Sequence, residues 1–139
     1  MADAGLEVDA LDFSPVMLAA ARAKGAARSG VRFTEADASH PPFEQGAYDA
    51  VLARHVLWAL PDPADALARW LRLLGPGGTL VLVEWHWSTG AGLRADQTVA
   101  LVEGTGREAR LTRLDDPALW GRTIEDDRYL VVSPSPALS

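Results

Sequence analysis

Two kinds of apolar spacing alternate along the chain and predict strands and helices in turn. Apolar and polar residues alternate over 6–13 and again over 31–36, which is the period of a half-buried strand. Between these segments, Ser14-Pro15 supplies an N-cap and a first-turn proline for a helix that runs to Gly25. Residues 48–53 form a third, more apolar strand. The first half of the chain is therefore predicted to be strand, helix, strand, strand.

The same alternation continues in the second half. The clearest helix begins at Asp62-Pro63, carries apolar residues on one face and ends at the glycine-rich segment 75–78. Residues 79–84 are apolar at almost every position, which predicts a strand buried on both faces. A weaker helical pattern covers 93–102, and 110–114 with 128–132 are predicted final strands. We expect an α/β fold: a mostly parallel, doubly wound sheet with a C-terminal antiparallel hairpin.

Composition narrows the class of protein. A chain of 139 residues with 48% hydrophobic content supports one domain, expected over 1–133, with a frayed tail at 134–139. The net charge of -6, without any basic block, disfavours a nucleic-acid partner. No cysteine is present, no histidine and acid pair has metal-ligand spacing, and neither a signal sequence nor a membrane-length apolar run is seen. We expect a cytoplasmic protein with no metal and no membrane association.

The motifs, taken in order, resemble those of class I S-adenosylmethionine-dependent methyltransferases. Residues 8–18, VDALDFSPVML, are similar to the second strand and following helix of that family, and 31–38 with 42–51 resemble its third and fourth strands. The segment 74–80, LGPGGTL, resembles the turn before its fifth strand, and 128–132 its closing strand. The resemblance covers nearly the whole chain. It implies a Rossmann-like sheet and a transferase that moves a methyl group from S-adenosylmethionine to a small molecule.

The resemblance also implies which residues bind the cofactor, because ligands of open parallel sheets lie beyond the carboxyl ends of the strands. It implies that Asp12 accepts hydrogen bonds from the ribose hydroxyls and that Phe13 packs near the adenine. It implies that Asp37 and the backbone of Ala38 bind the edge of the adenine, and that Arg54 lies beside the methionine part. A local role remains open for both aspartates, as a cap of the next helix or as a turn in the loop.

Two histidines follow strands whose ends are expected to meet. His55 comes after the strand 48–53 and His86 after the strand 79–84, so either imidazole can deprotonate a substrate hydroxyl before methyl transfer. Trp58, Trp85 and Trp87 are expected to form an apolar wall that can hold a cation. The alternative is that the tryptophans complete a core and that the histidines are structural.

The departure from the family pattern is at the start, where the first strand and the glycine-rich loop are missing. In the family that strand is central, and its loss would leave its two neighbours about 10 Å apart, twice the normal strand spacing. The two neighbours can pair directly, a second copy can lend a strand, or a partner chain can complete the sheet; a start internal to a longer protein is also open. A homodimer, strand-swapped in one form, is the favoured expectation.

The missing loop leaves two functions open. The first is methyl transfer to a small molecule with Asp12 and Asp37 holding the nucleoside. The second is a methyltransferase-like protein in which cofactor binding is lost, acting as a cyclase-type catalyst or as a binding and assembly partner. Whether the chain is an enzyme is thus undecided by sequence, with the resemblance favouring a transferase.

Overall fold

The computed structural model describes residues 7–12, 14–25, 30–115 and 126–136. The chain divides into two compact units, Met1–Pro42 and Phe43–Ser139, which are taken separately below. Phe13, predicted to lie near the adenine, falls outside the described residues. The expected single domain over 1–133 remains a prediction.

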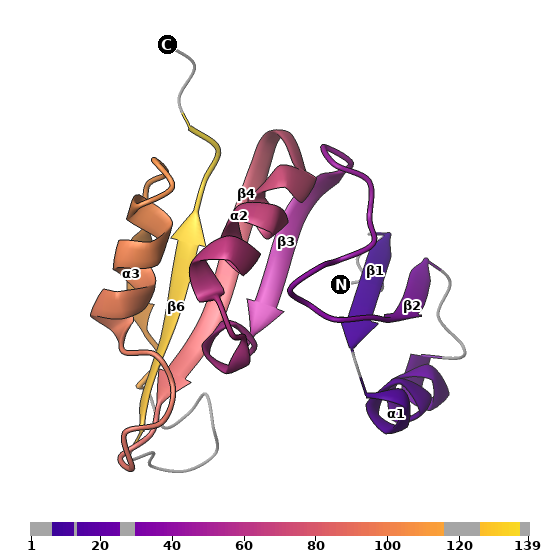
Figure 1. Cartoon of the computed structure of the whole chain (residues 1–139), viewed down its shortest axis with the longest axis horizontal. Coiled ribbons are helices and arrows are strands. Elements are labelled where there is room, and N and C mark those ends of the chain that lie inside the picture. The colour runs from indigo at the N-terminus through magenta and orange to yellow at the C-terminus, as the bar shows by residue number, and fades with distance from the viewer. Residues whose placement is uncertain (1–6, 13, 26–29, 116–125, 137–139) are drawn as a thin grey trace. The chain divides into compact units, whose positions relative to one another are not determined.

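The first unit is a strand, a helix and a second strand, as the sequence predicts. Strand β1 (Val8–Asp12) pairs in parallel with β2 (Val31–Glu35), and helix α1 (Pro15–Gly25) connects them (Figure 1). The hydroxyl of Ser14 accepts a hydrogen bond from the backbone N–H of Met17 at 3.3 Å, which is the predicted N-cap. Parallel strands need such a crossover, so the local signals and the pairing agree.

The second unit is a four-stranded sheet covered by helices. Its elements are β3 (Tyr48–Arg54), the 3-10 turn η2 (Leu57–Ala59), α2 (Pro63–Leu73), β4 (Leu74–His86), α3 (Ala95–Glu103), β5 (Arg110–Arg113) and β6 (Asp127–Ser133). The strand order is β3-β4-β6-β5, with β3 parallel to β4 and β6 antiparallel to both its neighbours. The α/β class, the parallel pairs and the antiparallel C-terminal strands confirm the predicted Rossmann-like fold.

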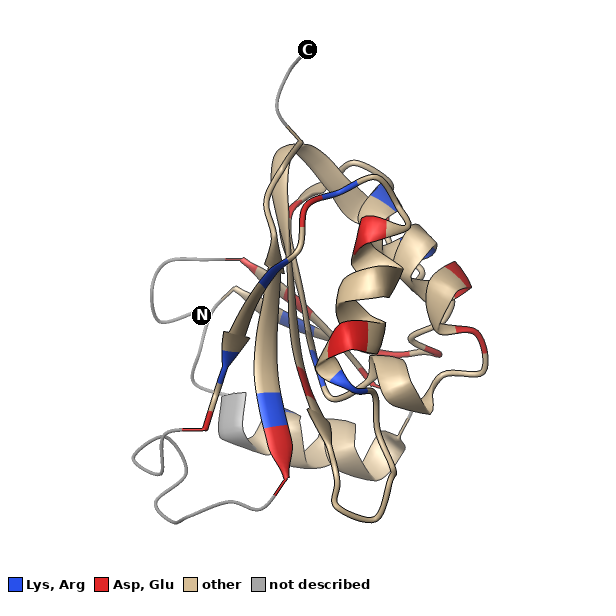
Figure 2. Ribbon diagram, turned by 90° about the vertical axis from the view of Figure 1, so that its left-hand side faces the viewer, with Lys and Arg blue, Asp and Glu red and all other residues tan. Residues whose placement is uncertain are grey.

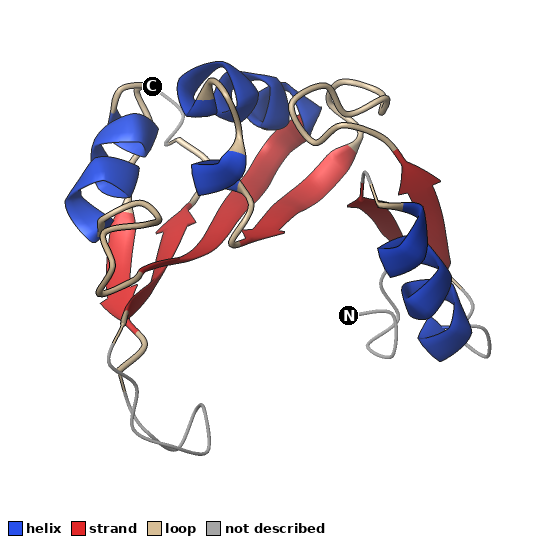
Figure 3. Cartoon of the chain, turned by 60° about the horizontal axis from the view of Figure 1, so that its bottom comes forward, coloured by secondary structure: helices blue, strands red, loops and turns tan. Residues whose placement is uncertain are grey.

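One face of this sheet carries the core. Helices α2 and α3 pack against it (Figure 3), and Leu80, Leu82, Tyr129 and Val131 are fully buried beneath them. Helix α2 begins at the predicted cap, because the Asp62 carboxylate accepts a hydrogen bond from the N–H of the third residue of the helix. Burial of this apolar stripe is what holds α2 on the sheet.

The opposite face of the sheet is less covered, and we call it the open face. It is formed by Leu52, Val81, Val83, Leu130 and Val132, which lie side by side in the strand register. Leu52 is 50% exposed, and the two valines of β4 are half-buried. The prediction that 79–84 is buried on both faces is therefore wrong within this unit, because α2 and α3 lie on the same side of the sheet.

Strand β4 also begins earlier than predicted. The segment 75–78, expected as a turn, is the first part of the strand and pairs with β3 through Tyr48 and Leu74. A Cβ added at Gly75 would lie 2.8 Å from the carbonyl oxygen of Gly46, so the close backbone approach requires glycine there. The glycines therefore allow the strand to continue rather than end it.

Within the described part of the chain, the first unit holds the sheet β1-β2 and the second the sheet β3-β4-β6-β5. The repairs considered for a missing central strand, direct pairing of its two neighbours included, stay predictions. None of the described helices is long and apolar enough to cross a membrane. Basic and acidic positions are interspersed along the ribbon of the four-stranded unit (Figure 2), with no basic block.

Candidate functional site

The carboxyl end of β3 turns sharply at His55. This residue has φ +53°, in the left-handed region that non-glycine residues seldom adopt. Its backbone N–H donates to the carbonyl of Val83 at 2.6 Å, so pairing with β4 continues while the chain leaves the sheet. A strained residue of this kind costs on the order of 1 to 3 kcal/mol and persists only where its surroundings hold it.

Glu84, inside the sheet, helps to keep the backbone near His55 in this conformation. Its side chain is fully buried on β4, and its Oε1 accepts a hydrogen bond from the backbone N–H of Leu57 at 2.9 Å. Leu57 is the first residue of η2, directly after the turn at His55. One buried carboxylate therefore ties β4 to the segment that leaves β3.

The second oxygen of Glu84 faces His55. The distance from Glu84 Oε2 to His55 Nδ1 is 3.3 Å, but the geometry is not that of a hydrogen bond. Within the described residues, Glu84 Oε2, both ring nitrogens of His55 and Trp58 Nε1 are buried without a hydrogen-bond partner. Each such atom costs about 1 to 3 kcal/mol. A concentration of them at one strand end is typical of a functional site rather than of a core.

Three indoles surround the His55 imidazole. The ring of Trp85 lies parallel to it, with centroids 3.6 Å apart and planes within 6°. Trp87 meets it edge-on at 4.7 Å, and Trp58 is tilted by 29° at 5.0 Å. We call these four rings and Glu84 the His55 cluster. The predicted wall of tryptophans is therefore present, and an imidazole fills the space between its members.

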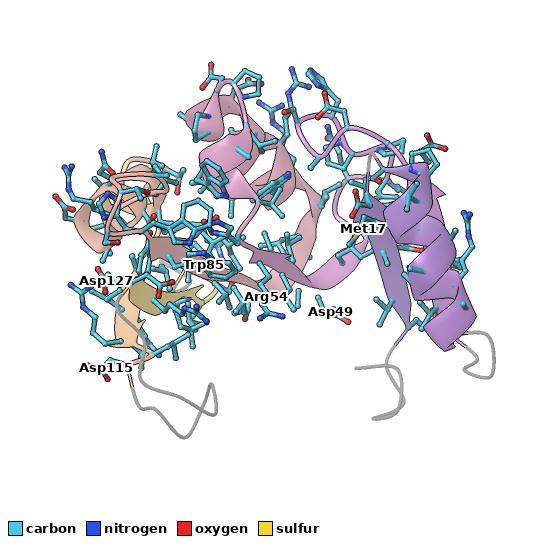
Figure 4. The ribbon with its side chains drawn as sticks, turned by 90° about the horizontal axis from the view of Figure 1, so that it is seen from below. Met17, Asp49, Arg54, Trp85, Asp115 and Asp127 are labelled. Atoms are coloured by element: carbon cyan, nitrogen blue, oxygen red, sulfur yellow. The ribbon has the colours of Figure 1, made fainter. Side chains whose placement is uncertain are left out.

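Two arginines also lie over the Trp85 indole. The guanidinium carbons of Arg128 and Arg54 are 5.3 and 6.0 Å from its centroid, and Figure 4 shows Arg54 and Trp85 on the neighbouring strands β3 and β4. Arg128 is held by Asp126 at 2.9 Å. Neither Arg128 nor Asp126 could be predicted for this site from the sequence, because only the antiparallel pairing of Trp85 with Arg128 brings β6 to it.

Burial shifts the pKa values of His55 and Glu84, the two groups at the centre of the His55 cluster. Burial, reinforced by the positive charge of Arg128, lowers the pKa of His55 to about 4. Burial raises the pKa of Glu84 to about 7, against the opposing effect of the backbone N–H groups of residues 56–58. Near neutral pH the imidazole is therefore uncharged, while the carboxyl group is close to its midpoint.

His86, the other predicted base, is placed differently. It is the last residue of β4, where its backbone bridges to Gly92 and stands opposite Asp127. No ring contact between His86 and the His55 cluster occurs among the described residues. The structure thus brings one of the two predicted imidazoles together with the indoles. A role for either histidine in catalysis stays a prediction.

The predicted cofactor residues of the first unit stand at the carboxyl ends of β1 and β2. Asp12 Oδ1 accepts from the N–H of Ser14 at 3.0 Å, and Asp37 Oδ1 accepts from the N–H of Ser39 at 2.8 Å. These are the local turns that sequence analysis kept as an alternative. The Oδ2 atom of each aspartate has no partner in the described ranges, so the local turn leaves half of each carboxylate open. Ala38 is half-buried between Asp37 and Ser39.

In the described parts of the chain, no group of three or more acidic, histidine or cysteine side chains has the arrangement of a metal site. The absence of a metal stays a prediction.

Comparison with known proteins connects these observations to a family. The chain is 48% identical over 82 residues to the demethylmenaquinone methyltransferase of Thermus thermophilus, a match that covers 58% of this chain and 37% of that protein. The chain therefore spans little more than a third of that curated relative.

Solved structures share the fold at low sequence identity. The [4+2]-cyclase SpnF superimposes with a TM-score of 0.78 at 20% identity, covering 96% of this chain and 67% of the cyclase. A SAM-dependent methyltransferase from Aquifex aeolicus gives a TM-score of 0.72 at 15% identity, covering 94% and 69%. A family profile described as "Methyltransferase domain" matches residues 1–82, more than half of the chain. On that match, this chain belongs to the methyltransferase domain family.

Proposed function

We propose that the chain serves S-adenosylmethionine-dependent methyl transfer to a small molecule. Membership of the methyltransferase domain family carries the proposal. Two structural features support it: a pair of half-open carboxylates follows parallel strands, where open α/β sheets bind ligands, and a buried imidazole follows another.

The carboxylates suit a nucleoside cofactor. Vicinal ribose hydroxyls need a strong acceptor, and Asp12 offers its open Oδ2 for them; Asp37 with the backbone of Ala38 would hold the adenine edge. Phe13 would pack near the adenine, and Arg54 would lie beside the methionine part of the cofactor. When bound, S-adenosylmethionine supplies a methyl group activated by a positively charged sulfur.

In this proposal, the His55 cluster binds the small molecule that accepts the methyl group. Its imidazole is neutral near pH 7, so one ring nitrogen has a lone pair that can take a proton from a substrate hydroxyl, although the lowered pKa of His55 makes it a weak base. His86 at the end of β4 is the second candidate base. The indoles of Trp58, Trp85 and Trp87 favour a flat, apolar substrate. Because a relative is named a demethylmenaquinone methyltransferase, a demethylated menaquinone is the first acceptor to test.

Calorimetric titration of the purified chain with S-adenosylmethionine tests the proposal. We expect stoichiometric binding that weakens at least tenfold, or about 1.4 kcal/mol, in Asp12→Ala. The matched control is Glu7→Ala, which removes an exposed carboxylate just before β1, at the end of the strand away from Asp12. No heat from the folded wild-type protein, or equal loss in both variants, would overturn the assignment.

We also propose that the chain forms a homodimer and that it is located in the cytoplasm. Strand β3 stands at the edge of the described four-stranded sheet, which supports a second copy lending or docking a strand there. Light scattering of the same samples measures the mass; twice 14.9 kDa supports the dimer and 14.9 kDa contradicts it.

A second candidate function is a cyclase-type reaction or a binding role in the same fold. Its support is the shared fold with a [4+2]-cyclase. Transfer of a labelled methyl group to an acceptor would exclude it. Cofactor binding without transfer to any acceptor, or no binding at all, would favour it over methyl transfer.

A further inference from the structure

The space between Glu84 and His55 holds room for one hydrogen atom. Glu84 Oε2 and His55 Nδ1 lie 3.3 Å apart, and both are buried without another partner among the described residues. Glu84 Oε1 is already committed to the backbone N–H of Leu57. A small rotation of either side chain brings the facing atoms into a hydrogen bond, and the bond needs one hydrogen, from the carboxyl or from the ring.

We propose that a single hydrogen lies between Glu84 Oε2 and His55 Nδ1 and belongs to one group or the other, so that the ionisation of Glu84 decides which ring nitrogen of His55 carries its hydrogen. With Glu84 ionised, Nδ1 must carry the hydrogen to satisfy the carboxylate, and Nε2 is left with a lone pair. With Glu84 protonated, its Oε2–H donates to Nδ1, and the hydrogen of the neutral ring moves to Nε2. The ring stays neutral in both states; only its tautomer changes.

The surroundings favour these two states over an ion pair. Trp85 and Trp87 shield the imidazole, and the charges that act on it are those of Arg128 on β6 and its partner Asp126, just before that strand. Arg54 on β3 lies over the Trp85 ring. Tyr129, opposite Glu84 on β6, is uncharged, because burial raises its pKa to about 12. Burial and the charge of Arg128 oppose a positive charge on His55, and they outweigh the opposite effect of Asp126.

The tautomer change falls near neutral pH. Because burial raises the pKa of Glu84 to about 7 and lowers that of His55 to about 4, the carboxyl titrates while the ring remains neutral. Above pH 7 the lone pair lies on Nε2; between pH 4 and 7 it lies on Nδ1, facing Glu84. Glu84 is thus a positioning residue for His55. The role of Nε2 as a base rests on the proposed function, whereas the tautomer change does not.

Nitrogen-15 NMR of the free chain tests the inference without substrate or cofactor. The chain has three histidines, so spectra of His40→Asn and His86→Asn assign the His55 ring. We expect the two His55 nitrogen shifts to exchange character, with a midpoint near pH 7 that matches the carboxyl carbon-13 titration of Glu84. A single tautomer from pH 5 to 9, or an imidazolium in that range, would overturn the proposal.

Glu84→Gln provides the second test. The amide keeps an acceptor for the Leu57 N–H but cannot ionise, so the His55 step near pH 7 should vanish. The control Glu103→Gln removes an exposed carboxylate at the end of α3 and should leave the step unchanged. Persistence of the step in folded Glu84→Gln would contradict the proposal. If that variant fails to fold, the comparison of the His55 and Glu84 midpoints in the wild-type protein still tests the proposal. Failure of methyl transfer would leave these spectra unaffected.

Discussion

The imidazole of His55 stacks on the indole of Trp85, with ring centroids 3.6 Å apart and planes within 6°. His55 leaves β3 through a left-handed turn, and Trp85 stands near the end of β4, so the stack joins the ends of two parallel strands. Because the indole covers one side of the imidazole, it removes water from a group that would otherwise be protonated in mildly acidic solution.

Replacing Trp85 with a smaller side chain should let water reach the His55 imidazole again. In Trp85→Leu we expect the pKa of His55 to rise from about 4 by at least one unit, since burial is the main cause of its depression. Titration of the His55 ring by NMR measures the change. Phe43→Leu, which alters an aromatic pair with Tyr48 elsewhere in the same unit, is the control. An unchanged His55 pKa would show that the stack does not shield the ring.

Arg128 depresses the same pKa through its charge. Arg128→Gln should therefore raise the pKa of His55, by less than Trp85→Leu does, because desolvation is the larger cause. Arg113→Gln on β5 removes a charge without touching the Trp85 ring and should have a smaller effect. If Arg113→Gln matches Arg128→Gln, the effect comes from net charge rather than from the position of Arg128 over the cluster.

The pH dependence of stability should change in Glu84→Gln. A carboxyl with a raised pKa binds its proton more tightly in the folded state, so the wild type loses stability as the pH rises from about 4.5 to about 7. His55 acts in the opposite sense, adding stability from about pH 4 to about 6.5, so the two nearly cancel in the wild type.

Removing the Glu84 carboxyl should leave the contribution of His55 to the pH dependence of stability unopposed. Relative to wild type, Glu84→Gln should gain about 3 kcal/mol of unfolding free energy between pH 4.5 and 7, an order-of-magnitude figure from the size of the pKa shift. Urea unfolding at several pH values measures it. Parallel stability curves for the two proteins would contradict the raised pKa of Glu84.

A second buried polar contact anchors α3 to the sheet. Tyr129 Oη donates to the carbonyl of Leu93 at 2.6 Å and lies 2.6 Å from Thr98 Oγ1, which therefore donates to it. Thr98→Val keeps the shape of the buried side chain but loses this bond, and should cost about 1 kcal/mol of unfolding free energy. The exposed Thr112→Val on β5 should change stability by less than half of that. Equal effects in urea unfolding would show that the buried bond adds nothing.

Local signals were enough to predict most of the elements. The cap and proline at Ser14-Pro15 and at Asp62-Pro63, and the apolar periods that follow, depend only on neighbours in the sequence, and both helices start where these signals place them. The start of β4 was missed, because glycines that resemble a turn are required there for close contact with Gly46.

The order of strands and helices and the α/β class could be predicted from periodicity, and the family from motifs read in order. The chemistry of the site, in contrast, depends on contacts between segments that lie far apart in the sequence. The burial of Glu84 follows from α2 and α3 sharing one face of the sheet, and the approach of Arg128 to Trp85 follows from the register of β4 with β6. Such distances and burials arise from pairing between distant segments, and the pKa values of His55 and Glu84 depend on them.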